Sequence, residues 1–222
     1  MPIPGLLPTP GSPPRLLLQD QAYDRIKELI QAGTYPPGTF LSERKLSRDL
    51  GMSKTPIRAA LTRLDIEGFV AVSPQQGIVV RETSLHEIVD MFDIRAALES
   101  FVVRSISGRL TEPQAARLRQ NVKDQTESVR AGDDVTLTRL DTEFHLMLCE
   151  FLDNREIVRV MLHLRDKLHR VILRVNQASG RLQDARREHA GIAEAVLRGK
   201  GDLAAERVKE HLEFGKRFLV SR

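Results

Sequence analysis

The second half of the sequence places four side chains that commonly ligate metals on otherwise apolar helical faces. Asp141 and His145 lie four residues apart and so share one face of a helix, while His189 and His211 continue two further apolar stripes. The apolar residues spaced around them are Leu137, Phe144, Leu148, Ile192, Ala193, Val196, Ala204, Val208, Leu212 and Phe218. Burying an unpaired carboxylate or imidazole is costly, and one shared metal ion would satisfy all four groups. Three imidazoles and one carboxylate suit Zn²⁺, with Ni²⁺ or Mn²⁺ as alternatives.

Other interpretations of these four residues stay open on spacing alone. An Asp-x-x-x-His pair on a helix also forms a local hydrogen bond, and a single histidine on a core face is often purely structural. A metal with an open coordination position could instead activate water, which would make the chain a metal-dependent hydrolase. Against the hydrolase, the sequence places no general base near the four residues, and the basic N-terminal segment would have no role.

That basic segment, residues 42–64, is a second constellation with possible chemistry. Its cations outnumber its acidic residues by six to two, and they are Arg44, Lys45, Arg48, Lys54, Arg58 and Arg63. Lys54 and Arg58 are four residues apart and share a helix face, with Ser53 and Thr55 at the start of the same helix. Such a helix can direct its first turn at base edges while its cations bind phosphates. The alternative is a pair of charged, solvated helices in an unrelated small domain.

The elements that must position these cations favour DNA binding. Helical spacing runs from Leu16 to Gly33, from Ser42 to Gly51 and from Ser53, a candidate N-cap, to Gly68. Two β-branched runs, 69–72 and 78–80, then flank a turn and predict a hairpin. Three helices followed by a hairpin are typical of a winged helix-turn-helix, whose wing tip, Gln76 and Gly77, we expect to enter a minor groove.

Only helical patterns follow, which predicts a mostly α-helical chain with an antiparallel helical bundle behind the winged helix. The predicted helices span 84–107, 111–131, 133–152, 154–177, 182–199 and 201–220. We therefore expect a disordered, proline-rich tail at 1–15, a DNA-binding domain at 16–83 and a sensor and dimerisation domain at 84–222, with a hinge at 81–84.

Composition agrees with a cytoplasmic protein. Of 222 residues, 41% are hydrophobic and 29% charged, and the net charge of +4 permits nucleic-acid binding without demanding it. The single cysteine, Cys149, excludes an intramolecular disulfide and lies in an apolar run, so a buried structural thiol is expected. No stretch has the length and apolarity of a membrane span.

The segment from Leu41 to Leu61, together with the 67–70 run and the lead-in at 30–38, resembles the GntR family of regulators. The resemblance implies DNA contacts at Arg44, Lys54 and Arg58. It also implies a wing glycine at Gly77. The sequence departs from the family at two positions, where it has Lys54 in place of the usual arginine and Ala59 in place of the usual glutamate. Lysine cannot make the bidentate contact of arginine, so a phosphate contact is expected at Lys54.

The rest of the chain resembles the FCD branch of the same family, named after the C-terminal domain of a fatty-acid regulator. The residues that carry the resemblance are Arg95, Glu99, Asp141, Phe144, His145, Asn154, Glu188, His189, Ile192, Ala195, Gly199, Asp202, Ala205, His211 and Leu212. The resemblance implies metal ligands at Asp141, His145, His189 and His211, and effectors that are small organic acids. Six helices in this domain resemble the smaller, VanR-like subgroup.

Arg95 has two interpretations of equal standing. It can form a buried pair with Glu99 one turn along the helix, or grip the carboxylate of an effector beside the metal. We expect a homodimeric repressor that binds a palindromic operator and responds to a small carboxylate, and that is not an enzyme. A metal-free sensor domain and an architectural DNA-binding protein are the remaining alternatives.

Overall fold

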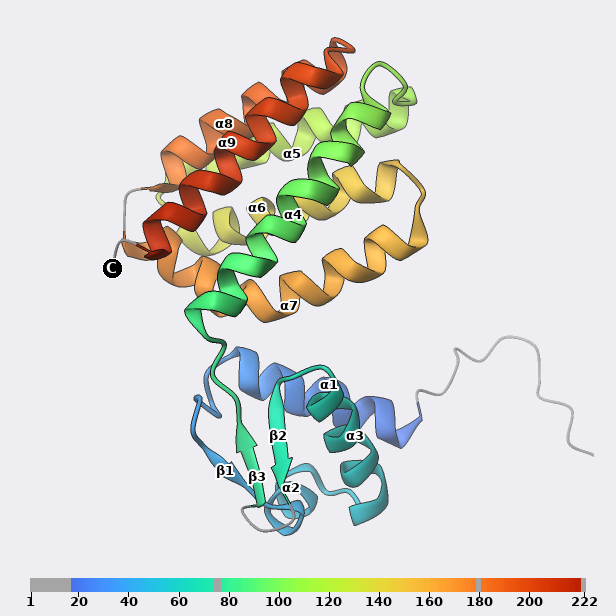
Figure 1. Ribbon diagram of the computed structural model, residues 1–222, viewed down its shortest axis with the longest axis vertical. Helices are drawn as coiled ribbons and strands as arrows, with labels where there is room; N and C mark the ends of the chain where they lie inside the picture. The colour runs from blue at the N-terminus through green and yellow to red at the C-terminus, as the bar shows by residue number, and fades with distance from the viewer. Residues whose placement is uncertain (1–16, 74–76, 179–180, 221–222) are drawn as a thin grey trace, which may run out of the picture. The chain divides into compact units, whose positions relative to one another are not determined.

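The computed structural model describes residues 17–73, 77–178 and 181–220, which fall into two compact units divided between Glu82 and Thr83 (Figure 1). The division lies within the segment 81–84, where the hinge is expected. The predicted disordered tail, 1–15, lies outside the described residues.

The first unit packs three helices around one apolar core. They are α1 (Leu18–Gln31), α2 (Glu43–Leu50) and α3 (Lys54–Ile66). Ser42 caps α2 by accepting a hydrogen bond from the Lys45 amide, and Gly51 ends it with a left-handed φ of 64°. This tight turn between α2 and α3 makes the helix-turn-helix. Leu18 is exposed although it lies within the helical span predicted from Leu16, and the buried stripe of α1 begins at Ala22.

A small antiparallel sheet completes the first unit. It contains β1 (Phe40–Leu41), β2 (Val70–Ser73) and β3 (Gly77–Val80) in the order β1-β3-β2. The predicted hairpin is present, with Val70 opposite Val80 and Ser73 opposite Gly77. Strand β1 was not predicted from the sequence, because two residues are too few to show an alternating pattern. The winged helix-turn-helix is confirmed.

The second unit contains six helices within the described residues. They are α4 (Leu85–Ile106), α5 (Glu112–Ala131), α6 (Asp134–Phe151), α7 (Arg155–Ala178), α8 (Arg181–Leu197) and α9 (Gly201–Val220). Capping boxes begin α4, with Ser84 and Glu87, and α5, with Thr111 and Gln114. Helix α4 packs on α9, α5 packs on α6 and α8, and α6 packs on α7. The all-helical C-terminal domain is confirmed.

The centre of this second core is partly polar. Phe144, Leu148 and Ile192 are fully buried, as expected for inward positions, but so is His189. The side chains around His189 form the candidate site described next. No described helix is long and apolar enough to cross a lipid bilayer.

Candidate metal centre and nucleic-acid interface

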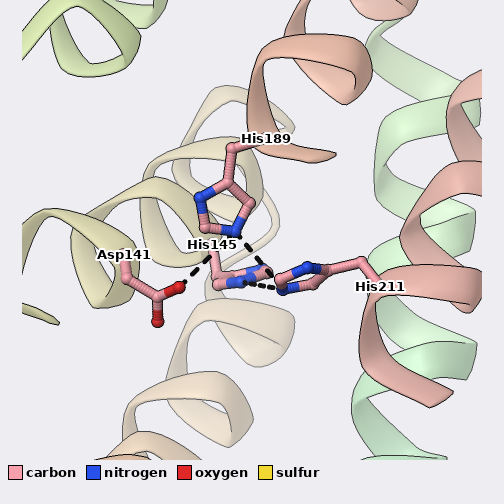
Figure 2. Close-up of side chains that lie close together, drawn as sticks. All are labelled: Asp141, His145, His189 and His211. Atoms are coloured by element: carbon pink, nitrogen blue, oxygen red, sulfur yellow. Dashed lines mark hydrogen bonds and ion pairs between the residues drawn. The ribbon is translucent and has the colours of Figure 1, made fainter. Parts of the chain in front are cut away.

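Three helices bring the four predicted ligands together inside the second unit. Asp141 and His145 come from α6, His189 from α8 and His211 from α9, and all four are buried. Figure 2 shows the three imidazoles and the carboxylate directed toward one another. The His211 Nε2 atom lies 3.2 Å from His145 Nε2 and 3.3 Å from His189 Nε2, and Asp141 Oδ1 lies 3.5 Å from His189 Nε2.

These separations fit one small metal ion. Four ligands about 2.1 Å from a tetrahedral Zn²⁺ would be separated from one another by about 3.4 Å. One ligand atom from each of the four residues lies within 4.8 Å of every other, so a single ion could contact all of them.

Each imidazole is oriented through its other ring nitrogen. The Nδ1 atom of His145 lies 2.5 Å from Glu99 Oε2, that of His211 2.6 Å from Glu188 Oε2, and that of His189 2.9 Å from Gln125 Oε1. Because these partners are acceptors, each Nδ1 donates its proton and each Nε2 directs a lone pair at the centre. Such outer partners are typical of histidine ligands in metal sites.

With these tautomers, the three Nε2 atoms and the Asp141 carboxylate all face the centre as acceptors. Burial lowers the pKa of His211, despite the opposing hydrogen bond to Glu188, so this ring is neutral at neutral pH. A cation at the centre would interact favourably with the Nε2 lone pairs and with the Asp141 carboxylate. The donor set thus fits a divalent metal ion.

Glu99 joins the cluster to Arg95. Its carboxylate is buried and accepts from Arg95 Nε at 2.8 Å and from His145. Burial alone would raise the pKa of Glu99, but the charge of Arg95 and the hydrogen bonds from both partners lower it to about 2. The Arg95–Glu99 pair expected as one of the two interpretations is therefore present.

Arg95 also lines a small cavity beside the cluster, as the other interpretation requires. The cavity has a volume of about 20 Å³, and its lining includes Asp141, His145, Met161 and Arg165. An open groove of about 560 Å³ lies on another side of the cluster, beside Glu188 and His211. The cluster is therefore close to two hollows of very different size.

The predicted DNA-contacting cations are exposed or half-buried on α2 and α3. Arg44 and Lys54 form no ion pair within the described part of the chain. Arg58 is held by Glu43 through two hydrogen bonds of 2.9 Å. Lys45 pairs with Asp49 at 2.7 Å, and Arg48 contacts the same carboxylate at 3.3 Å.

The uncharged residues of the predicted interface have mixed outcomes. Ser53 occupies the predicted N-cap position of α3, but its side chain makes no capping hydrogen bond. Thr55 is exposed in the first turn of α3. Gly77 begins β3 with a φ of 82°, a conformation that favours glycine. Gln76 lies outside the described residues.

Sequence reasoning missed two polar residues that support the cluster, Asn121 and Gln125 on α5. Both are buried, and the Gln125 Nε2 amide donates to Asn121 Oδ1 at 2.7 Å. Their signal was available, since two amides four residues apart interrupt an apolar stripe that includes Leu118. The link from Gln125 to His189 was not, because it joins residues 64 positions apart.

A winged helix-turn-helix joined to an all-helical domain is the architecture of a class of DNA-binding regulators. Residues 18–80 match the family model described as bacterial regulatory proteins, gntR family, and residues 90–214 match the FCD domain. The chain therefore belongs to the GntR family, in its FCD branch. FCD domains are known to bind metal, and the buried cluster could hold one.

Curated relatives and solved structures agree. The chain is 30% identical to the Nta operon transcriptional regulator of Aminobacter aminovorans, over 81% of this chain and 83% of the relative. It is 26% identical to the HTH-type transcriptional repressor RspR of Escherichia coli K12, over 88% and 86% of the two chains. The structure of E. coli McbR/YncC shares the fold, with a TM-score of 0.77 and 20% identity over 93% of this chain and 99% of that one. The chain is a DNA-binding transcriptional regulator and not an enzyme.

Proposed function

We propose that this regulator binds a palindromic operator as a homodimer, and that a small carboxylate effector bound beside a metal ion controls its DNA affinity. The observation that carries the proposal is the buried cluster of Asp141, His145, His189 and His211, in which every imidazole directs Nε2 at a common centre. We expect it to act as a repressor in the cytoplasm, where its operator would be.

The four residues of the cluster would hold the metal. Three imidazoles and one carboxylate favour Zn²⁺, with Ni²⁺ or Mn²⁺ as alternatives that depend on supply as well as affinity. A bound divalent ion would supply a positive coordination point for an effector carboxylate. The protein's own part is to fix the ring orientations through Glu99, Gln125 and Glu188.

Arg95 is the proposed second contact for the effector. It reaches Glu99 through Nε, which leaves its terminal guanidinium nitrogens able to donate to another carboxylate. The same guanidinium lines the 20 Å³ cavity together with Asp141 and His145. A cavity of this size has room for about one water molecule, so we expect an effector to enter only when the surrounding helices move apart.

The effector can act on DNA binding through α4, which carries Arg95 and begins immediately after the segment 81–84. An effector changes DNA affinity only if it binds one arrangement of the protein better than another. Contacts from a single helix to both the effector and the linker provide a physical route for that preference.

On DNA, we propose that the first turn of α3 and the wing contact the duplex. The contacting residues would be Arg44, Lys45, Arg48, Ser53, Lys54, Thr55, Arg58, Gln76 and Gly77. Because Ser53 does not cap α3, its hydroxyl is available to a phosphate oxygen. Lys54 would bind a phosphate as a point charge. Glu43 holds the Arg58 guanidinium through Nε and one terminal nitrogen, which leaves the other terminal nitrogen to donate to a base or a phosphate.

Hydrolysis is not supported by the geometry. Glu99 is the buried carboxylate nearest to a ligand imidazole, and its pKa of about 2 makes it a poor base at neutral pH. Its lone pairs are already engaged by Arg95 and His145.

The proposal is tested on an operator selected from a pool of random duplexes by the purified protein. Affinity for that operator is measured by fluorescence anisotropy with zinc-loaded and chelator-treated protein, with and without a panel of small carboxylates. We expect at least one carboxylate to change the affinity of the zinc-loaded protein only. An acid that acts equally on both forms would point to a metal-free sensor, and no response to any acid would contradict effector control.

Arg58→Ala tests the DNA-binding half separately. We expect a large loss of operator affinity with an unchanged circular dichroism spectrum, because the side chain is exposed and contributes little to the core. Arg119→Ala, which removes an exposed arginine from α5, is the matched control. Unchanged binding by Arg58→Ala would show that α3 is not the recognition helix.

A further inference from the structure

We propose that Asn121 and Gln125 are positioning residues that fix the tautomer of His189 and so keep its Nε2 atom available as a ligand. The inference rests on the proposed metal site and concerns residues outside its ligand set. It follows from the direction of a chain of three buried hydrogen bonds that begins at the main-chain carbonyl of Leu140.

The main-chain carbonyl of Leu140 sets the donor-to-acceptor direction of the whole hydrogen-bond chain. A main-chain oxygen can only accept, so the Asn121 amide presents Nδ2 to Leu140 O at 3.2 Å and its oxygen to the other side. That oxygen accepts from Gln125 Nε2 at 2.7 Å, which turns Gln125 Oε1 toward His189. Since Oε1 also only accepts, His189 must carry its proton on Nδ1, 2.9 Å away.

Reversing the Gln125 amide would disable the ligand. Its Nε2 group would then donate to His189 Nδ1, and the ring proton would move to Nε2, in the middle of the cluster. No solvent can correct the arrangement, because Gln125 and His189 are both fully buried. The ring cannot easily turn over either, since Phe144 stacks on it with centroids 4.3 Å apart and an angle of 18°.

The other two histidines explain why only His189 needs such a chain. Their partners, Glu99 and Glu188, present carboxylates that accept in either orientation and so fix the Nδ1 proton without help. An amide has a donor end and an acceptor end of nearly the same shape, so its orientation must be imposed by a further neighbour. Asn121 and Leu140 supply that neighbour.

The test is a double-mutant cycle on zinc affinity, measured for the full chain by competition with a chromophoric chelator. Asn121→Ala should lower the affinity of the protein by about tenfold or more, within the range seen for outer partners of metal ligands. Gln125→Glu should lower the affinity less than Asn121→Ala does, because a carboxylate accepts from His189 Nδ1 in either orientation although it cannot donate to Asn121 Oδ1. In the Gln125→Glu background Asn121→Ala should then have little effect, since the orientation of the group at 125 no longer matters.

Two controls separate orientation from packing. Gln120→Ala removes an exposed amide from the same helix and should leave the affinity unchanged. Gln125→Met keeps the size of the side chain but removes the acceptor, and should lower the affinity. Equal losses from Asn121→Ala in the wild-type and Gln125→Glu backgrounds would overturn the proposal and leave Asn121 a packing residue.

A second readout does not depend on metal. Imidazole ¹⁵N chemical shifts distinguish the two neutral tautomers of histidine. In the metal-free wild type they should show His189 protonated on Nδ1. In metal-free Asn121→Ala a larger share of His189 should be protonated on Nε2. A wild type that binds no zinc would end the proposed function, while these spectra would still decide the tautomer. Protonation of His189 on Nε2 in the wild type would overturn the proposal directly.

Discussion

Replacing Glu99 with glutamine should destabilise the helical domain by about 3 kcal/mol at neutral pH. The side chain is 1% exposed and is the acid partner of Arg95, which is also buried. Lowering the pKa of Glu99 from its usual 4.5 to about 2 corresponds to about 3 kcal/mol of stabilisation of the charged form. Removing one partner of a buried ion pair typically costs about 3–5 kcal/mol, in agreement with that figure.

The pH dependence of this loss has a definite sign. Because the folded-state pKa of Glu99 lies below the unfolded value, its stabilisation is fully present above about pH 4.5 and is lost as the pH falls toward 2. Between pH 5 and pH 3.5 the wild type should lose about 1 kcal/mol of its unfolding free energy through this group, and Glu99→Gln should not. The difference between the two proteins therefore narrows in acid.

Urea unfolding of chelator-treated protein, followed by circular dichroism at several pH values, measures both quantities. Glu127→Gln is the matched control, because that carboxylate is exposed and its ion pair with Lys123, at 3.8 Å, is long. Its free energy of unfolding should change by less than about 0.5 kcal/mol. A loss under 1 kcal/mol for Glu99→Gln, with an unchanged dependence on pH, would refute the buried charge network.

Three further results are expected. Glu43→Gln releases Arg58 and removes a negative charge from the proposed DNA-binding face, so binding to non-specific DNA should strengthen while the preference for the operator falls. Anisotropy titrations at several salt concentrations measure both affinities, and an unchanged preference would mean that Glu43 does not orient Arg58. Burial raises the pKa of the Cys149 thiol, so a thiol reagent at pH 8 should label it only after unfolding in urea, and rapid labelling of the native protein would contradict its burial. Phe101→Lys should weaken the proposed dimer, as measured by light scattering, because Phe101 and Ile94 are exposed apolar residues two turns apart on α4. Val135→Lys, at another exposed apolar residue, should leave the dimer intact. A dimer that survives Phe101→Lys would have its interface elsewhere.

The sequence was sufficient for features that repeat along the chain. Helical periodicity and glycine stops placed the helices of the bundle to within two residues of their observed bounds. The same periodicity singled out Asp141, His145, His189 and His211, because a polar residue on an apolar stripe is conspicuous. The structure brings these four residues together.

Features that depend on contacts between helices were not accessible from the sequence. The Glu43–Arg58 pair joins α2 to α3, and Gln125 reaches His189 from a different helix. Periodicity shows which face of a helix is inward but not which residue of a neighbouring helix lies opposite. Ser53 shows a related limit, since a residue type that suits an N-cap does not determine where its hydroxyl points.

Elemental analysis of the untagged protein after incubation with Zn²⁺ and removal of excess metal tests the central claim most directly. We compare the wild type with His189→Ala and with His86→Ala, which removes an exposed histidine outside the cluster. The account predicts about one metal ion per chain in the wild type and His86→Ala, and none in His189→Ala. A wild type without metal, or a His189→Ala variant that retains it, would contradict the proposed centre.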